Sequence, residues 1–176
     1  LGSRSVAIGW NALNDQSFSS TTETYSTAVG YEAGCKVTTG TENTLIGGLA
    51  GDAITTASGC TAVGSQALGE QAGDFNTAVG RKTLNGVTSS GDRNVGMGEV
   101  AGFNVTSGSS NTLVGTGAAY ELTSGGNNIC LGANAGRASS PSGSITTGSD
   151  TICLGDNSIN DLFCADTSIS SSDSRD

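Results

Sequence analysis

The chain has 176 residues, of which 28 are glycine and eight are aromatic, and its formal net charge is −9. It contains no histidine, the commonest general base and metal ligand, so we expect no metal site, no cofactor and no Ser–His or Cys–His catalysis. Its seven Lys and Arg residues are dispersed and no apolar run approaches the roughly 20 residues that span a membrane. We therefore expect neither nucleic-acid binding nor membrane insertion, and the five cysteines, without a CxxC pair, indicate no zinc site and no full disulfide framework.

A five-residue motif, Asn76-Thr77-Ala78-Val79-Gly80 in one copy, recurs along the whole chain. The other copies are Ser5–Gly9, Ser26–Gly30, Asn43–Gly47, Cys60–Gly64, Asn94–Gly98, Asn111–Gly115, Asn128–Gly132 and Thr151–Gly155. Six of the eight spacings between closing glycines are 16 to 18 residues. A steady period of this length predicts an all-β parallel β-solenoid, or β-roll, of about nine coils of about 17 residues, each with two short strands and two turns.

The motif positions predict which side chains share a face, because side chains alternate along a strand. Position four is always apolar and position two is Val, Thr or Ile, so we expect these two to line the coil interior. Position three would then face outward, although it is never charged, and a strand that is apolar on both faces is covered on both. The residues at position three are Ala7, Ala28, Leu45, Ala62, Ala78, Gly96, Leu113, Cys130 and Cys153.

A thin solenoid has one interior, so the second cover is expected from other chains. This pattern predicts a homotrimer of intertwined or side-by-side solenoids, with position three as the trimer interface. Loops of the same chain covering that flank are the alternative. Asn at position one is expected to form a hydrogen-bonded ladder along the solenoid, and Cys130 and Cys153 are expected to stack as buried thiols.

Two insertions and the C-terminal segment interrupt the repeat. The longer spacings place extra residues at 15–24 and 138–149, which we expect in surface loops. We expect a repetitive solenoid over 1–155, a capping segment over 156–166 with Ile159, Leu162 and Phe163, and a Ser- and Asp-rich linker over 167–176. Residues 156–161 start like a calcium loop but lack its Gly and Glu, so a capping turn is favoured.

Trp10 and Tyr31 each follow a closing glycine in neighbouring coils. Stacked in register, they would form a flat aromatic pair suited to a sugar ring or to a seam between protomers. They are the candidate receptor contact. Phe103 and Tyr120 lie near turns, and we expect them to plug coil corners.

Repeats of the form Asn-Thr-x-Val/Ile-Gly-x-x-Ala-Gly resemble those of phage tail fibres and of the heads of trimeric autotransporter adhesins. The C-terminal stretch, from Thr151 to Asp176, resembles the junction before the intramolecular chaperone domain of tail fibres and tailspikes. In that family a Ser-Asp-x-Arg-x-Lys motif carries autocleavage after the serine. The resemblance assigns Ser172 as the nucleophile, followed by Asp173, while the lysine base would come after Asp176. It implies a trimeric fragment of a longer precursor that is not an enzyme in this form.

The leading hypothesis is therefore a structural and host-recognition segment of a virion tail fibre, extracellular and bound to a host-surface glycan or protein receptor. The head of a bacterial trimeric autotransporter is the first alternative. An ice-binding solenoid would need an unbroken exposed Thr array. The Thr column at position two is interrupted by Val6, Val95, Ile129 and Ile152, and it is expected to face inward. A tailspike depolymerase domain would need paired carboxylates, and none stand at equivalent places in the repeats.

Overall fold

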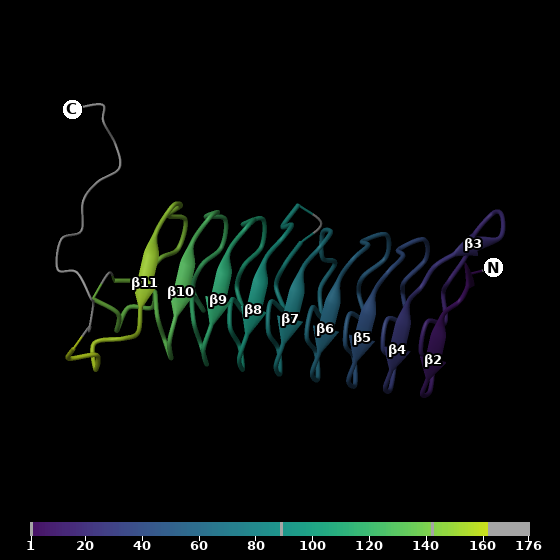
Figure 1. The fold of residues 1–176 in the computed structure, drawn as a ribbon, viewed down its shortest axis with the longest axis horizontal. Helices are drawn as coiled ribbons and strands as arrows, with labels where there is room; N and C mark the ends of the chain where they lie inside the picture. Colours follow the sequence, from purple (N-terminus) through teal and green to yellow (C-terminus); the bar gives the residue numbers. More distant parts are fainter. Residues whose placement is uncertain (1, 89, 142, 162–176) are drawn as a thin grey trace, which may run out of the picture.

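The computed structural model describes residues 2–161 except 89 and 142, and shows a parallel β-solenoid (Figure 1). Each repeat contributes one strand of three residues, and nine strands lie in one sheet in the order of the chain. They are β2 (Val6–Ile8), β4 (Thr27–Val29), β5 (Thr44–Ile46), β6 (Thr61–Val63), β7 (Thr77–Val79), β8 (Val95–Met97), β9 (Thr112–Val114), β10 (Ile129–Leu131) and β11 (Ile152–Leu154). Two further strands, β1 (Gly2–Ser3) and β3 (Thr22–Glu23), pair beside the N-terminal end. Within the described residues there is no helix, and the all-β solenoid is confirmed.

The sheet keeps one register along its length. Between β6 and β7, for example, Ala62 pairs with Ala78 and Val63 with Val79. Because neighbouring strands lie about 4.8 Å apart, equivalent residues of successive coils form continuous rows along the molecule.

Two details of the coil differ from expectation. Nine strands leave eight connections between them, so the count of nine coils is not confirmed. Within the described residues, the polar side of the coil, which was expected to hold a second strand, contributes no strand to the large sheet. It carries single rungs, such as the Thr38 amide donating to the Thr55 carbonyl at 2.8 Å and the Thr106 amide donating to the Thr123 carbonyl at 2.8 Å. Gly- and Ser-rich turns follow at once, and they break the run of extended residues that a ladder needs.

The predicted orientation of the motif is wrong: position three faces the interior of its own coil, and positions two and four face outward. Ala28, Leu45, Ala62, Ala78, Leu113 and Cys130 are 0% exposed in the single chain, Cys153 is 3% exposed and Gly96 is buried. They therefore cannot be the trimer interface. Ala7 alone is exposed, because β2 is the end strand of the sheet.

Small residues at position three make room for side chains from the turns of the same chain, not for another chain. A Cβ atom at Gly96 would lie 2.8 Å from Cγ of Leu84. Leu68, Leu84 and Leu122 come from the turns and are fully buried. The interior of each coil is therefore filled by two sets of side chains, those at position three of the strand and those from the turns of the same chain.

The closing glycine of each motif has a backbone that other residues rarely adopt. Gly47 has φ +134°, and a Cβ atom there would lie 2.7 Å from the carbonyl carbon of Gly64 in the next coil. The adjacent Gly48 has no positive φ, and a Cβ atom there would meet nothing within 4 Å. The first glycine is required by coil stacking, whereas the second is not.

The predicted asparagine ladder is present. Asn76, Asn94, Asn111 and Asn128 are 0% exposed. The Nδ2 of Asn111 donates to the Oδ1 of Asn94 at 2.9 Å, and the Nδ2 of Asn128 donates to the Oδ1 of Asn111 at 3.0 Å. Each amide also binds the backbone of the next coil, as in the Asn111 contact with the Gly125 carbonyl at 3.0 Å. Buried polar groups that are all paired in this way hold neighbouring coils in one register.

The ladder is broken at Cys60, where a thiol stands at position one. Its Sγ lies 3.3 Å from the Gly73 carbonyl oxygen, and burial raises the pKa of the thiol to about 11. Cys130 and Cys153 lie opposite one another in β10 and β11, as predicted, and both are buried.

Beyond β11 the side chain of Ile159 packs over Gly155. A Cβ atom added to Gly155 would lie 2.2 Å from Cγ1 of Ile159. The carboxylate of Asp156 accepts a hydrogen bond from the Ser158 amide at 2.9 Å, a capping turn that lowers the pKa of Asp156. Leu162, Phe163 and the linker 167–176 lie outside the described residues.

We predict opposite outcomes for two adjacent substitutions. Gly47→Ala should cost about 3 kcal/mol or more, because it combines an unfavourable φ with a backbone overlap. Gly48→Ala should change the free energy of unfolding by less than about 0.5 kcal/mol, because its Cβ enters open space. Chemical denaturation followed by circular dichroism measures both, and equal losses in the two variants would contradict the stacking requirement.

We also predict that Cys60→Asn stabilises the fold by about 1 kcal/mol, because a side-chain amide there would join Asn43 to Asn76 and complete the ladder. Cys60→Ala is the matched control and should destabilise the protein. Thermal unfolding compares the two variants. A lower midpoint for Cys60→Asn than for Cys60→Ala would show that this 16-residue coil lacks room for the amide.

Candidate functional site

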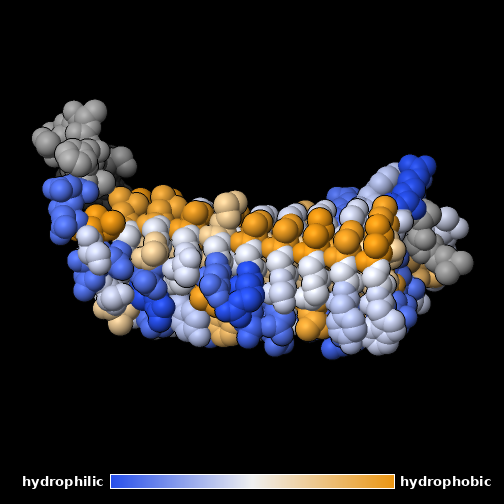
Figure 2. Space-filling view, turned by 90° about the horizontal axis from the view of Figure 1, so that it is seen from below, coloured by the Kyte–Doolittle hydropathy of each residue, from blue (hydrophilic) through white to orange (hydrophobic). Residues whose placement is uncertain are grey.

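The outward face of the large sheet carries a continuous apolar row. We call the side chains of motif positions two and four the outer sheet face. In Figure 2 an orange band of hydrophobic residues runs along most of the molecule. Ile8 is 59% exposed, Met97 45% and Leu154 44%. The full row at position four is Ile8, Val29, Ile46, Val63, Val79, Met97, Val114, Leu131 and Leu154.

The area of this face can be compared with that of known interaction surfaces. Eight strand spacings of about 4.8 Å and three residues of about 3.3 Å give a face of roughly 38 by 10 Å, or about 400 Å². Position two is mainly Thr, so only the position-four part of this area is apolar throughout. A contiguous apolar stripe along the whole sheet is still a candidate interaction surface. A specific interface usually buries about 800 Å² per partner, so the residues flanking the sheet would have to take part as well.

Trp10 and Tyr31 form the flat aromatic pair that the sequence predicted. Their ring centroids are 5.1 Å apart with an interplanar angle of 14°, and the side chains are 64% and 55% exposed. Trp10 is held between Gly9, with φ +129°, and Asn11, with φ +60°. The closing glycine and the left-handed residue after it thus turn the chain sharply, so that the ring projects at the edge of the outer sheet face. Its role as a receptor contact stays a prediction.

These two rings begin a longer row, which we call the rim row. It consists of the first residue after each closing glycine: Trp10, Tyr31, Gly48, Ser65, Arg81, Glu99, Thr116, Ala133 and Asp156. Backbone hydrogen bonds link its members coil by coil, including Glu32 N–H to the Trp10 carbonyl and Leu49 N–H to the Tyr31 carbonyl, both 2.8 Å. Partial desolvation, and then the charge of Glu32, raise the pKa of the Tyr31 hydroxyl. Arg81 forms an ion pair with Glu99 in the next coil.

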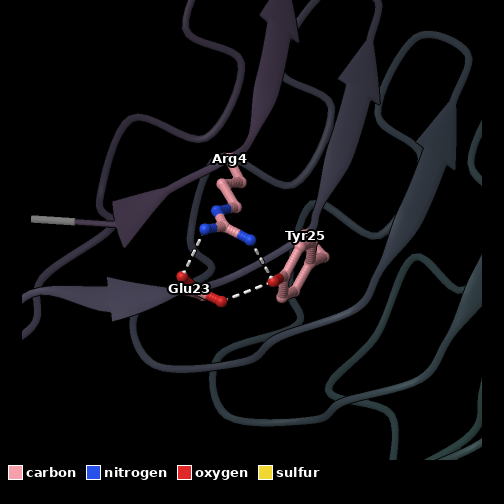
Figure 3. A network of polar contacts seen from close by, with 3 residues as sticks. All are labelled: Arg4, Glu23 and Tyr25. Carbon is pink, nitrogen blue, oxygen red and sulfur yellow. Dashed lines mark hydrogen bonds and ion pairs between the residues drawn. The ribbon is translucent and has the colours of Figure 1, made fainter.

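A polar network lies at the N-terminal end of the solenoid, just before β2 and β4 begin (Figure 3). The guanidinium of Arg4 makes an ion pair with Glu23 at 2.7 Å and donates to the hydroxyl of Tyr25 at 2.7 Å. The Tyr25 hydroxyl in turn donates to Glu23, and that bond raises the pKa of Tyr25. The three side chains are exposed and satisfy one another, so the network ties β1 and β3 to the first coils.

The structure also reveals a second stack, which was not predicted from the sequence. Phe103 and Tyr120 are stacked at 5.2 Å and 5°, and the guanidinium of Arg137 lies 4.9 Å from the Tyr120 ring centroid. This stack could have been predicted from the spacing of its residues, because positions 103, 120 and 137 follow one another at intervals of 17 residues. The sequence analysis expected each ring to plug a separate coil corner. In the structure the two rings instead stack on one another along the molecule.

A hollow lies next to Arg137 at the start of the 138–149 insertion, with a volume of about 330 Å³ and a lining that includes Glu121 and Asn134. The Arg137 guanidinium donates to Oδ1 of Asn134 at 3.0 Å. Glu121 accepts a hydrogen bond from Ser144 of the insertion. The hollow is therefore polar, and its charged groups are already engaged with neighbouring side chains.

Several candidate residues proposed from the sequence fall elsewhere. Ser172 and Asp173, the residues of the candidate autocleavage junction, lie outside the described residues. Within 2–161, leaving out 89 and 142, no group of three or more His, Cys, Asp or Glu is placed to hold a metal. In the same part of the chain no helix is long and apolar enough to cross a membrane.

Compared with known protein families, with curated proteins and with solved structures, the chain matches none of them.

Proposed function

We propose that this chain is a structural and host-recognition segment of a phage tail fibre. In this proposal three copies form a rod on the virion, outside the cell, and their outer sheet faces meet at the three-fold axis. Trp10 and Tyr31 contact a glycan or protein receptor on the host surface. The segment catalyses nothing in this form.

The observation that carries this proposal is the unbroken apolar row at position four, which lies exposed or half-exposed along an in-register sheet. Because the interior of the solenoid is already filled, no other part of the chain that the structure describes covers that row. The outer sheet face also carries a second, different row at position two, which is mainly Thr with Val and Ile. In a closed ring of identical copies, one row of each copy meets the other row of the next copy.

A half-exposed Thr row on the outer sheet face favours one alternative, an ice-binding solenoid. The expectation that the Thr column faces inward is wrong, because position two points outward with position four. Thr27, Thr44, Thr61 and Thr77 occupy four successive coils. The neighbouring row is aliphatic, however, and Val95 interrupts the Thr column. Ice binding would show as thermal hysteresis in a dilute sample, and its presence would replace the trimer as the role of this face.

We predict that Val79→Asp converts a trimer of about 52 kDa (three times 17.3 kDa) into a folded monomer. A carboxylate at an outward position would be desolvated and unpaired at the three-fold axis, but solvated in the monomer. Light scattering gives the mass, and circular dichroism checks that the fold is kept.

Ser107→Asp is the matched control, because it adds the same charge at an exposed turn away from the outer sheet face. It should remain trimeric. Ala78→Asp is unsuitable here, since Ala78 is fully buried and the variant should unfold. A monomeric wild type, or a Val79→Asp protein that stays trimeric, would overturn the proposed interface.

A further inference from the structure

The rim row contains a gap directly beside the aromatic pair. Tyr31 lies between Trp10 on one side and Gly48 on the other, as the backbone hydrogen bonds from Glu32 to Trp10 and from Leu49 to Tyr31 show. One face of the Tyr31 ring is covered by Trp10. The coil on the other side offers no side chain at Gly48, where even a Cβ atom would meet nothing within 4 Å.

The gap extends over two coils. After Gly48 the row continues with Ser65, a short exposed side chain, and then with the larger Arg81. Tyr31 and Arg81 are three coil spacings apart, or about 14 Å. We call this space the rim notch: its floor is Gly48 and Ser65, and its two walls are Tyr31 and Arg81.

The molecule itself shows what fits against Tyr31. A planar ring one coil away, that of Trp10, packs on it at 5.1 Å. A ligand that enters the notch at the level of Gly48 would stand at the same spacing on the opposite face. It must therefore bring a flat, apolar ring face of its own.

The surroundings of the notch narrow the class of ligand. Ser65 supplies a hydroxyl, and Arg81 and Glu99 supply a mutually neutralised ion pair at the far wall. These groups suit a ring whose edge carries hydroxyls that donate and accept hydrogen bonds. A net charge of −9 disfavours nucleobases on a phosphate chain and acidic ligands.

We infer that the rim notch binds one neutral pyranose unit of a glycan, with the C–H face of the sugar stacked on Tyr31 and its hydroxyls directed to Ser65 and Arg81. This inference rests on the proposed host-recognition function and deepens it, because it names the ligand class and moves the contact from the Trp10–Tyr31 pair as a whole to the free face of Tyr31. Trp10 is then a positioning residue that holds the Tyr31 ring from behind.

The notch can be tested without disturbing the fold. Methyl pyranosides of galactose, glucose, mannose and N-acetylglucosamine serve as probes in saturation-transfer NMR on the wild-type protein. At least one should bind, with the strongest transfer to the ring C–H protons of a single face. Galactitol, which keeps the hydroxyls of galactose but has no ring, should not bind.

Three variants locate the site. Gly48→Leu fills the notch with a side chain that has no aromatic face, and Tyr31→Leu removes the stacking wall. Each should weaken binding about tenfold or more. Ser107→Leu is the matched control: it adds the same side chain at an exposed turn away from the notch and should bind like the wild type. Circular dichroism confirms that all three are folded.

The failure of this inference is separable from failure of the rod proposal. If none of the pyranosides binds, or if binding survives in Gly48→Leu, the notch is not a sugar site, whatever the oligomeric state. The folded Val79→Asp protein should still bind the probe sugar, because the rim row lies beyond the closing glycine and outside the outer sheet face. A notch that binds sugar only in the trimer would show instead that a partner copy completes the site, and would overturn the single-chain notch described here.

Discussion

The stacking of one coil on the next at the spacing of a β-ladder is the constraint on which the rest of this structure depends. It is imposed at the closing glycine, where two backbones approach so closely that no Cβ atom fits. At Gly30 such an atom would lie 2.4 Å from the Gly47 carbonyl oxygen. Once that approach is fixed, the motif residues of successive coils fall into rows, and most of these rows present one kind of chemistry along the molecule.

Three rows show how the same geometry produces different properties. At position one the row is buried and polar, and asparagine side chains satisfy each other from coil to coil. At position three it is buried and apolar, and it packs against leucines of the turns. At position four it is apolar and exposed, which leaves the solenoid with a surface that its own chain does not cover. Stability and interaction thus come from neighbouring residues of one short motif.

The edge of the sheet is where the rows stop being uniform. The rim row changes from aromatic to glycine, serine and then charged residues, and the second stack, from Phe103 to Arg137, follows another column. A regular scaffold with variable columns can carry individual recognition features at fixed heights, because a change at the rim leaves the closing glycines and the asparagine ladder intact.

The sequence alone determined the architecture: the 17-residue period predicted the solenoid, position one predicted the asparagine ladder, and the glycine offset of Trp10 and Tyr31 predicted their stacking. These features depend on spacing, and spacing is visible in a string of letters. The sequence did not determine which side of the strand faces inward, because alternation assigns residues to two faces without saying which is covered. Only the tertiary structure decided that, through turn residues such as Leu84 that fill the coil against small side chains at position three. The sequence likewise did not predict the gap at Gly48, because nothing in it distinguishes Gly47 from Gly48. Only the structure shows that Gly47 touches the next coil and that Gly48 faces open space.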